Sequence, residues 1–340
     1  MPRRERTTGL PRPRLRTRAA SGRKVAGITW NEAHGRLAII GAAAALLVLV
    51  FGMFVYRWYD HNFAQPNHTV LSVGSQDFKL NYYTDRLYQF VQSNQQQQQS
   101  SSNLPLYEQQ LLTKLEDEAL TIQLAKDKGV DLSDDEITKE IASELGVPVG
   151  GTGSSFDTLY RARLKTLKIS DGSYRHLAEA ALANKKLLEK FKNEIGDTGE
   201  GVTIRTVVTA SKDDADKAAE RIKGGEDMGT VAQTASTDLD SKQQDGLLLP
   251  EPARLFPENI QKAIVDKPAG TELFGPVQVQ ANWWVFRVDK RDPAFAYSAT
   301  QKSQLAQAKL DDALKEKRAT TTIKRNLTAD DIAWALKNAG

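Results

Sequence analysis

The spacing of apolar and polar residues divides the chain into stretches of different character. An uncharged apolar run extends from Leu37 to Tyr56. Residues 69–195 repeat apolar side chains mostly at helical spacing, whereas residues 202–292 mix alternating, strand-like stretches with short amphipathic ones. Residues 298–340 return to a helical pattern. The chain is therefore predicted to be an α+β protein with a single N-terminal transmembrane helix, a helical domain and an α/β domain.

The apolar run has the length of a membrane span. Its 20 residues would form a helix of about 30 Å, which is the thickness of the hydrocarbon core of a bilayer. No small-x-small cleavage site follows it, and Tyr56, Trp58 and Tyr59 are typical of the aromatic belt at a membrane interface. An uncleaved anchor that contacts the lipid bilayer through Leu37–Tyr56 is therefore favoured over a cleaved signal peptide or a buried core helix.

Charge is distributed unequally on the two sides of this run. Residues 1–36 carry ten Lys or Arg side chains against two acidic ones, while the rest of the chain carries 36 basic and 41 acidic side chains. Because positive flanks stay in the cytoplasm, residues 1–36 are expected to be a basic, disordered cytoplasmic tail of a single-pass cell-membrane protein of bacterial type. The net-acidic domains beyond the run are then extracytoplasmic, and they are not expected to bind nucleic acid.

The first region beyond the membrane run is predicted to contain a short strand and successive helices. Gly129 ends one helix, and a capping box of Ser133 and Glu136 starts the next. The polar residues 94–103 and the Gly- and Pro-rich residues 147–155 read as loops, and residues 196–201 as a hinge-like linker. The predicted elements are a strand at 70–73 and helices at 77–91, 106–128, 133–145, 155–168 and 171–194.

The second region is predicted to combine strands and helices. Val202–Thr209 alternates as a strand, and Ala281-Asn282 is the predicted turn of a hairpin between residues 277–280 and 283–288. Amphipathic helices are expected at 213–223, 228–235 and 260–265, followed by a charged helix at 298–318 and a last helix that Thr328 caps.

Residue types that carry catalysis or bind metals are scarce. The chain has no cysteine and four His residues, which are scattered along it. It lacks the Gly-x-Ser-x-Gly, His-Glu-x-x-His, phosphate-loop and dinucleotide-binding motifs. No metal and no small-molecule cofactor is therefore expected, and a hydrolase or metalloenzyme is disfavoured.

Two stretches resemble families of folding factors. Gly224–Asp238, with its Gly-Glu-Asp, short helix and Ser-x-Asp, resembles the parvulin (PpiC-type) peptidyl-prolyl isomerase core, and Pro268–Val277 matches a second part of it. Upstream, residues 73–78 and the helices of residues 106–145 resemble the helical N-domain of SurA-like foldases. The resemblance implies a membrane-anchored SurA-like foldase or chaperone with a rotamase domain, whose helical domain is completed by the C-terminal helices.

The resemblance also implies a reaction. Peptidyl-prolyl isomerisation rotates an X–Pro bond over a barrier of about 20 kcal/mol without breaking a bond, so it needs neither a nucleophile nor a cofactor. The two His positions of the parvulin site fall on Thr206 and Trp284 in this sequence. These residues are either structural replacements in a degenerate domain or parts of a modified pocket that still works. The isomerase domain is therefore expected to be weak or inactive, with no confident catalytic residue.

The proline pocket departs from the family as well. Its Met position falls on Leu255 and its Phe position on Asn259 or Ile260, and Phe274 is a further apolar candidate. Each of these side chains either packs in the core or lines a peptide-binding groove. The candidates for peptide and proline binding are Leu255, Ile260, Phe274 and Trp284.

The sequence thus predicts an extracytoplasmic protein-folding factor that binds unfolded or nascent secreted and membrane polypeptides. The alternative is a membrane-anchored scaffold that recruits one specific envelope partner. The predicted divisions are the tail (1–36), the transmembrane helix (37–56), the SurA-like chaperone domain (57–195), the parvulin-like domain (202–292) and the C-terminal helices (298–340).

Overall fold

The computed structural model describes the chain except for residues 1–23, 26–27, 30–31, 96–103, 150–154 and 339–340. Most of the predicted basic tail and more than half of each of the two predicted loops at 94–103 and 147–155 lie outside the described residues. The chain divides into two compact units, Met1–Asn67 and His68–Gly340.

The first unit is dominated by one long apolar helix. A short antiparallel pair, β1 (Lys24–Val25) and β2 (Ile28–Thr29), precedes α1 (Glu32–Tyr59), which continues into a π-helical turn at Asp60–Ala64. Leu37–Ala64 is long and apolar enough to cross a membrane, and among the described residues it is the one helix that is. Its large apolar side chains are exposed rather than packed into a core. A single-pass membrane anchor is therefore consistent with this helix.

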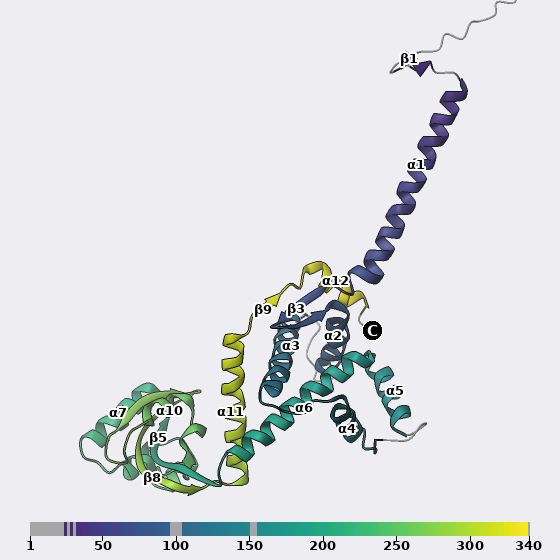
Figure 1. Cartoon of the computed structure of the whole chain (residues 1–340). Helices are drawn as coiled ribbons and strands as arrows, with labels where there is room; N and C mark the ends of the chain where they lie inside the picture. The colour runs from purple at the N-terminus through teal and green to yellow at the C-terminus, as the bar shows by residue number, and fades with distance from the viewer. Residues whose placement is uncertain (1–23, 26–27, 30–31, 96–103, 150–154, 339–340) are drawn as a thin grey trace, which may run out of the picture. The chain divides into compact units, whose positions relative to one another are not determined.

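The second unit begins with a small sheet and five helices, which Figure 1 labels. Strands β3 (Thr69–Val73) and β4 (Gln76–Lys79) form a hairpin. Helices α2 (Leu80–Gln95), α3 (Leu104–Asp127), α4 (Asp134–Glu144), α5 (Ser155–Leu167) and α6 (Asp171–Glu194) follow.

The C-terminal elements return to these helices. Helix α11 (Ala299–Thr320) contacts α3 and α6, β9 (Ile323–Arg325) adds to the free edge of β3, and α12 (Ala329–Asn338) contacts α2. Buried Ala306 and Leu310 of α11 share a core with α3 and α6, and Ala335 of α12 shares one with α2 and α3. We call these combined elements, Thr69–Glu194 with Ala299–Asn338, the helical region.

The intervening elements form a four-stranded antiparallel sheet in the order β6-β5-β8-β7. Its long central pair is β5 (Thr198–Thr209) and β8 (Asn282–Ala296), with β7 (Phe274–Val279) and β6 (Glu251–Pro252) at the edges. Helices α7 (Lys212–Lys223) and α8 (Met228–Ala235) pack on one face. Helix α10 (Glu258–Ile264) and a 3-10 turn at Ala253–Leu255 cover the other, and α9 (Leu239–Gln243) joins α8 to the sheet edge. We call Thr198–Ala296 the sheet region.

The predicted linker at residues 196–201 is wrong from residue 198 onward. Residues 198–201 belong to β5 and pair with the end of β8. A Cβ atom at Gly201 would lie 2.4 Å from the ring of Phe295. Glycine is therefore present because an aromatic ring lies against the backbone, and the strand continues where the composition indicated flexibility.

Two smaller predictions are also corrected. Ser133 precedes α4 but its side chain makes no capping hydrogen bond. Glu136 instead accepts hydrogen bonds from Lys139 (2.7 Å) and from Lys186 of α6 (2.9 Å), which lower its pKa to about 2. The hairpin turn lies at Gln280-Ala281, one residue earlier than predicted, because Gln280 adopts a positive φ of 55° and Asn282 already pairs with Val279.

Candidate peptide-binding site

The two residues at the family His positions lie on neighbouring central strands. Thr206 of β5 is directly opposite Phe286 of β8, and Trp284 of β8 is directly opposite Val208 of β5. Because opposite residues and residues two apart share one face of a sheet, all four side chains lie on the face that α10 covers. Thr206 and Trp284 therefore lie on neighbouring strands and share one face of the sheet, but they are not a directly facing pair.

Thr206 is wholly buried and its polar groups are already paired. Its exposed fraction is 0%. Its amide donates to the carbonyl of Gly246 (2.8 Å), and its hydroxyl Oγ1 donates to the carbonyl of Val285 (3.3 Å). Gly246 has a φ of +81°, and a Cβ there would lie 2.6 Å from the Thr206 carbonyl, so the loop can approach the strand only with glycine at this position. The hydroxyl thus satisfies the sheet rather than facing a ligand.

Three of the four predicted peptide-binding residues gather in one apolar cluster. Ile260 is fully buried in it, and Phe274 and Trp284 are partly buried against it. The ring of Phe274 stacks on that of Phe286 at 5.6 Å between centroids. Leu255 is half-buried at the end of the 3-10 turn, beside the buried Phe256 of the same cluster. Ile260 therefore serves the core, and Trp284 keeps part of its ring accessible.

A hollow of about 480 Å³ opens beside Trp284. Leu239 lines it with 69% of its surface exposed, and Asp238 caps the helix that Leu239 begins by accepting from the amide of Ser241 (2.9 Å). The sequence reasoning missed Leu239 because a short helix has no apolar period to reveal it, although the residue directly follows the quoted Ser-x-Asp motif. The hollow is lined by Val208, Thr237, Asp238, Leu239, Asp240, Asn282 and Trp284.

A carboxylate shared by two arginines lies on the opposite face of the sheet. Arg205 and Arg287 both donate to the carboxylate of Asp289, at 2.9 and 2.7 Å. At the start of α8, the backbone amide of Thr230 lowers the pKa of Asp227, which caps that helix. In the described part of the chain no three His, Cys, Asp or Glu side chains are grouped to hold a metal ion. The charges near the sheet thus support the fold, and the hollow beside Trp284 combines an apolar floor with two aspartates.

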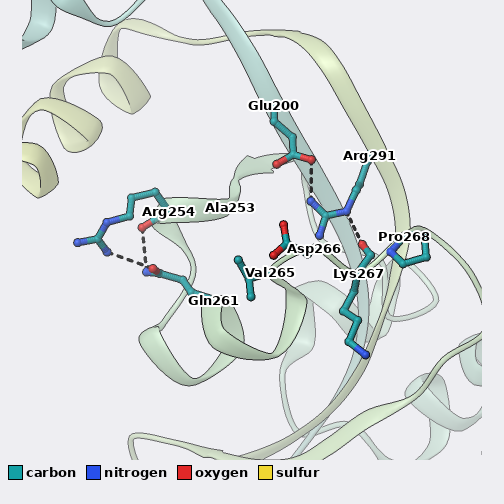
Figure 2. A pocket seen from close by; sticks show the side chains of 9 residues that line it. All are labelled: Glu200, Ala253, Arg254, Gln261, Val265, Asp266, Lys267, Pro268 and Arg291. Atoms are coloured by element: carbon teal, nitrogen blue, oxygen red, sulfur yellow. Dashed lines mark hydrogen bonds and ion pairs between the residues drawn. The ribbon is translucent and has the colours of Figure 1, made fainter.

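A second hollow of about 480 Å³ lies near the end of α10 (Figure 2). Arg291 crosses its wall, donating to Glu200 (2.6 Å) and to the carbonyl of Lys267 (2.5 Å). Arg254 donates to Gln261 (3.1 Å) in the same view. None of the predicted site residues lines this hollow. Its hydrogen-bonded Arg291 links β8 to Glu200 of β5 and to the segment after α10.

Family models match both regions. A model described as SurA-like N-terminal domain matches residues 29–188, and one described as PPIC-type PPIase domain matches residues 183–301. Among curated proteins, the foldase protein PrsA of Clostridium acetobutylicum is 24% identical over 222 residues. That match covers 60% of this chain and 66% of the relative, slightly less than two thirds of its length.

Solved structures with similar chains include two described as peptidylprolyl isomerase (PrsA). The one from Bacillus cereus has 15% identity and a TM-score of 0.38, covering 81% of this chain and 99% of its own. The one from Bacillus anthracis has 14% identity and a TM-score of 0.36, covering 65% of this chain and 93% of its own.

The chain thus combines a SurA-like N-terminal domain with a PpiC-type peptidyl-prolyl isomerase domain. It is homologous to the PrsA foldases. The predicted α+β class, with an apolar N-terminal helix, a SurA-like helical domain and a PpiC α/β domain, is confirmed. The predicted domain boundaries and site residues remain predictions.

Proposed function

We propose that this protein is a membrane-anchored folding factor that binds unfolded secreted or membrane polypeptides outside the cytoplasm, and that its isomerase domain is weak or inactive. The observation that carries the second part is Thr206, which is wholly buried and whose hydroxyl is bonded to the carbonyl of Val285. A catalyst of X–Pro rotation must bind the twisted bond more tightly than either planar isomer. A polar group that is enclosed and already paired contributes nothing to that preference.

Binding without catalysis is better supported by the same site. Trp284 and Leu239 present apolar surface in an open hollow beside the sheet, and an apolar side chain of an unfolded polypeptide gains free energy by leaving water there. We propose that Trp284 and Leu239 make this contact, and that Phe274 and Leu255 contribute further apolar surface to the site. Ile260 then acts through packing.

The membrane location rests on the helix Leu37–Ala64 and on charge. The described part of the helix is apolar and exposed, as a bilayer-facing helix must be. The ten basic residues before it favour a cytoplasmic N-terminus. The foldase role is carried by the homology with PrsA, a protein named as a foldase.

Two assays on the full chain in lipid nanodiscs test the proposal. In a prolyl-isomerisation assay the chain should leave the uncatalysed rate nearly unchanged. In aggregation assays it should protect several unrelated unfolded proteins, and Trp284→Ala or Leu239→Ser should weaken that protection. Leu249→Ser is the matched control, because Leu249 is similarly exposed (72%) but lies outside the hollow.

Two outcomes would contradict the proposal. Clear acceleration of isomerisation that Trp284→Ala abolishes would show a working, modified pocket. Protection of no unfolded protein, together with tight binding to one folded envelope partner, would favour a scaffold instead.

A further inference from the structure

A separate hollow lies within the helical region, lined by residues of α2, α3, α5 and α6 and by Glu144 of α4. Its volume is about 300 Å³, and Phe90, Leu167 and Leu177 supply apolar wall. Helices α2, α3 and α6 contact one another (Figure 1), so the cavity is built on the packed part of the fold. It has the size and lining to receive one apolar side chain.

The charged groups around this hollow are nearly all paired with one another. Arg86 donates twice to Glu118, at 2.8 Å each. Glu144 accepts from Arg163 (3.2 Å) and from the hydroxyl of Tyr174 (3.0 Å). These pairs leave the carboxylates of the wall occupied, so the wall offers little to a cationic ligand.

One buried hydrogen-bond donor of the hollow has no partner among the described residues: the side-chain Nε2 of Gln89 is buried without a hydrogen bond. Lys114, an exposed residue of α3, lines the same hollow and forms no ion pair with a described carboxylate. A buried donor without a partner is costly unless a ligand supplies an acceptor. The hollow therefore offers an amide N–H and an ammonium group beside an apolar wall. A ligand with an acidic group could accept hydrogen bonds from both.

An adjoining hollow indicates that the ligand is extended. It measures about 240 Å³ and shares Leu177 with the first, and Glu118 of the Arg86 pair lines it. It continues along α6 as far as Asn184, which is about 10 Å of helix beyond Leu177. A polypeptide segment matches two neighbouring hollows better than a small molecule does.

We infer that this paired hollow binds an extended segment of unfolded polypeptide in which an apolar side chain is next to Asp or Glu. The inference rests on the proposed function and adds the class of segment selected. The carboxylate contacts Lys114 and Gln89, and the apolar side chain lies among Phe90, Leu167 and Leu177.

The test measures the affinity of fluorescent peptides for the full chain, which is held in nanodiscs of uncharged lipid. Three peptides share one uncharged host sequence with a central Leu-Asp, Leu-Asn or Leu-Lys pair. The Leu-Asp peptide should bind at least several-fold more tightly than the others, and added salt should reduce the difference because charge carries it. Equal affinities for all three peptides would overturn the inference.

Variants locate the binding in this hollow. Lys114→Gln should abolish the preference for Leu-Asp over Leu-Asn, whereas Lys190→Gln, which changes an exposed lysine of α6 outside the hollow, should not. Gln89→Leu should weaken binding of the Leu-Asp peptide while leaving the unfolding midpoint unchanged or higher, since it removes an unpaired buried donor. Equal effects of Lys114→Gln and Lys190→Gln would place the site elsewhere. If the three peptides bind equally well and the protein still prevents aggregation, this inference is wrong but the proposed function stands. If the protein binds no unfolded chain at all, the proposed function is wrong as well.

Discussion

The helical region and the sheet region differ in how they treat charge. The buried charged side chains of the described residues, Arg86, Glu116 and Asp331, all belong to the helical region. The buried polar side chains of the sheet region are neutral hydroxyls, and its Arg205–Asp289 pair keeps 19% and 17% of its side-chain surface exposed. Glu116 bonds to Arg318 and Arg325, and Asp331 to His68, across the two distant segments of the chain, whereas Arg86 pairs with Glu118 within the first of them.

Glu116 shows what the buried charges do in the helical region. It is 1% exposed on α3 and accepts from Arg318 of α11 (2.7 Å) and Arg325 of β9 (2.5 Å), some 200 residues further along the chain. A misplaced C-terminal segment would leave this carboxylate buried and unpaired, which costs several kcal/mol. Buried charge therefore specifies where the returning segment docks, whereas apolar burial and strand pairing are enough for the sheet region.

The largest expected effect is from Phe286→Ala in the sheet region. Phe286 is fully buried opposite Thr206, and truncation of a buried Phe costs about 3–5 kcal/mol of unfolding free energy. Hydrogen exchange should accelerate in β5 and β8 and remain slow in α3 and α6. Equal acceleration in both regions would mean that they unfold as one cooperative unit and that the comparison has no energetic basis.

Arg86→Met should be next in size and act on the helical region. Arg86 is 4% exposed and Glu118 11%, so the variant leaves a nearly buried carboxylate without its partner and costs about 3 kcal/mol. Urea unfolding measures the loss. The double variant Arg86→Met/Glu118→Leu should recover most of it, and Arg205→Met in the sheet region should cost about 1 kcal/mol or less. A double variant as unstable as Arg86→Met would argue against charge burial as the cause.

Gly201→Ala should destabilise the β5–β8 strand pair by about 1–3 kcal/mol, the usual cost of overpacking. The added Cβ would meet the Cβ and Cγ atoms of Phe295 at 2.6 and 2.4 Å, close to its backbone, so rotation of the ring does not relieve the clash. In a thermal unfolding cycle, Gly201→Ala should cost much less in a Phe295→Gly background, which removes both of the contacting side-chain atoms, than in the parent chain. A linker, as the composition indicated, would tolerate Gly201→Ala in either background.

The smallest expected effect is a loss of unfolding free energy at low pH, to which the two regions contribute unequally. Burial alone would raise the pKa of Glu116, but hydrogen bonds from Arg325 and Arg318 outweigh it and hold the pKa below its ordinary value of 4.5. The stabilisation is therefore complete above 4.5 and is lost as the pH falls through the lower, folded-state pKa. Urea unfolding from pH 6 to pH 3 should show a shallower decline for Glu116→Gln than for the parent chain.

A salt comparison sharpens that measurement. In the sheet region the pKa of Glu226 is lowered by the hydrogen bond from Arg221, but this carboxylate is at the surface. Half-molar salt should suppress its contribution far more than that of Glu116. A decline that salt weakens equally in both regions would show that Glu116 is solvated in solution.

Secondary structure could be predicted closely wherever a local pattern decides it. Asp171–Glu194 and Met228–Ala235 begin and end where predicted, because their apolar periods are regular and Ser170 and Asp227 cap them. Thr328 caps α12 as expected, with the Asp331 amide donating to its hydroxyl (3.2 Å). Strands β4, β6 and β9 were missed, since two to four residues carry too little pattern to reveal a strand.

The candidate site could be predicted only in part. The family positions identified Thr206 and Trp284 on neighbouring strands, but the register that separates them by two pairs depends on hydrogen bonding across the sheet. Leu239 was missed because nothing in its local sequence distinguishes an apolar residue that lines a hollow from one that is merely exposed. Ile260 was a candidate for the groove, yet α10 turns it wholly into the core.

By itself, the sequence determined the apolar helix, the two-part α+β organisation and the family to which each part is similar, because runs, periods and motifs are properties of neighbouring residues. Only the tertiary structure decided the fate of individual polar groups. It drew Glu136 away from its expected cap to Lys186, enclosed Glu116 between two arginines of the C-terminal segment, and bonded the Thr206 hydroxyl to Val285. Each of these partners lies at least 50 residues away along the chain, and no local pattern records which distant group folding brings within hydrogen-bonding distance.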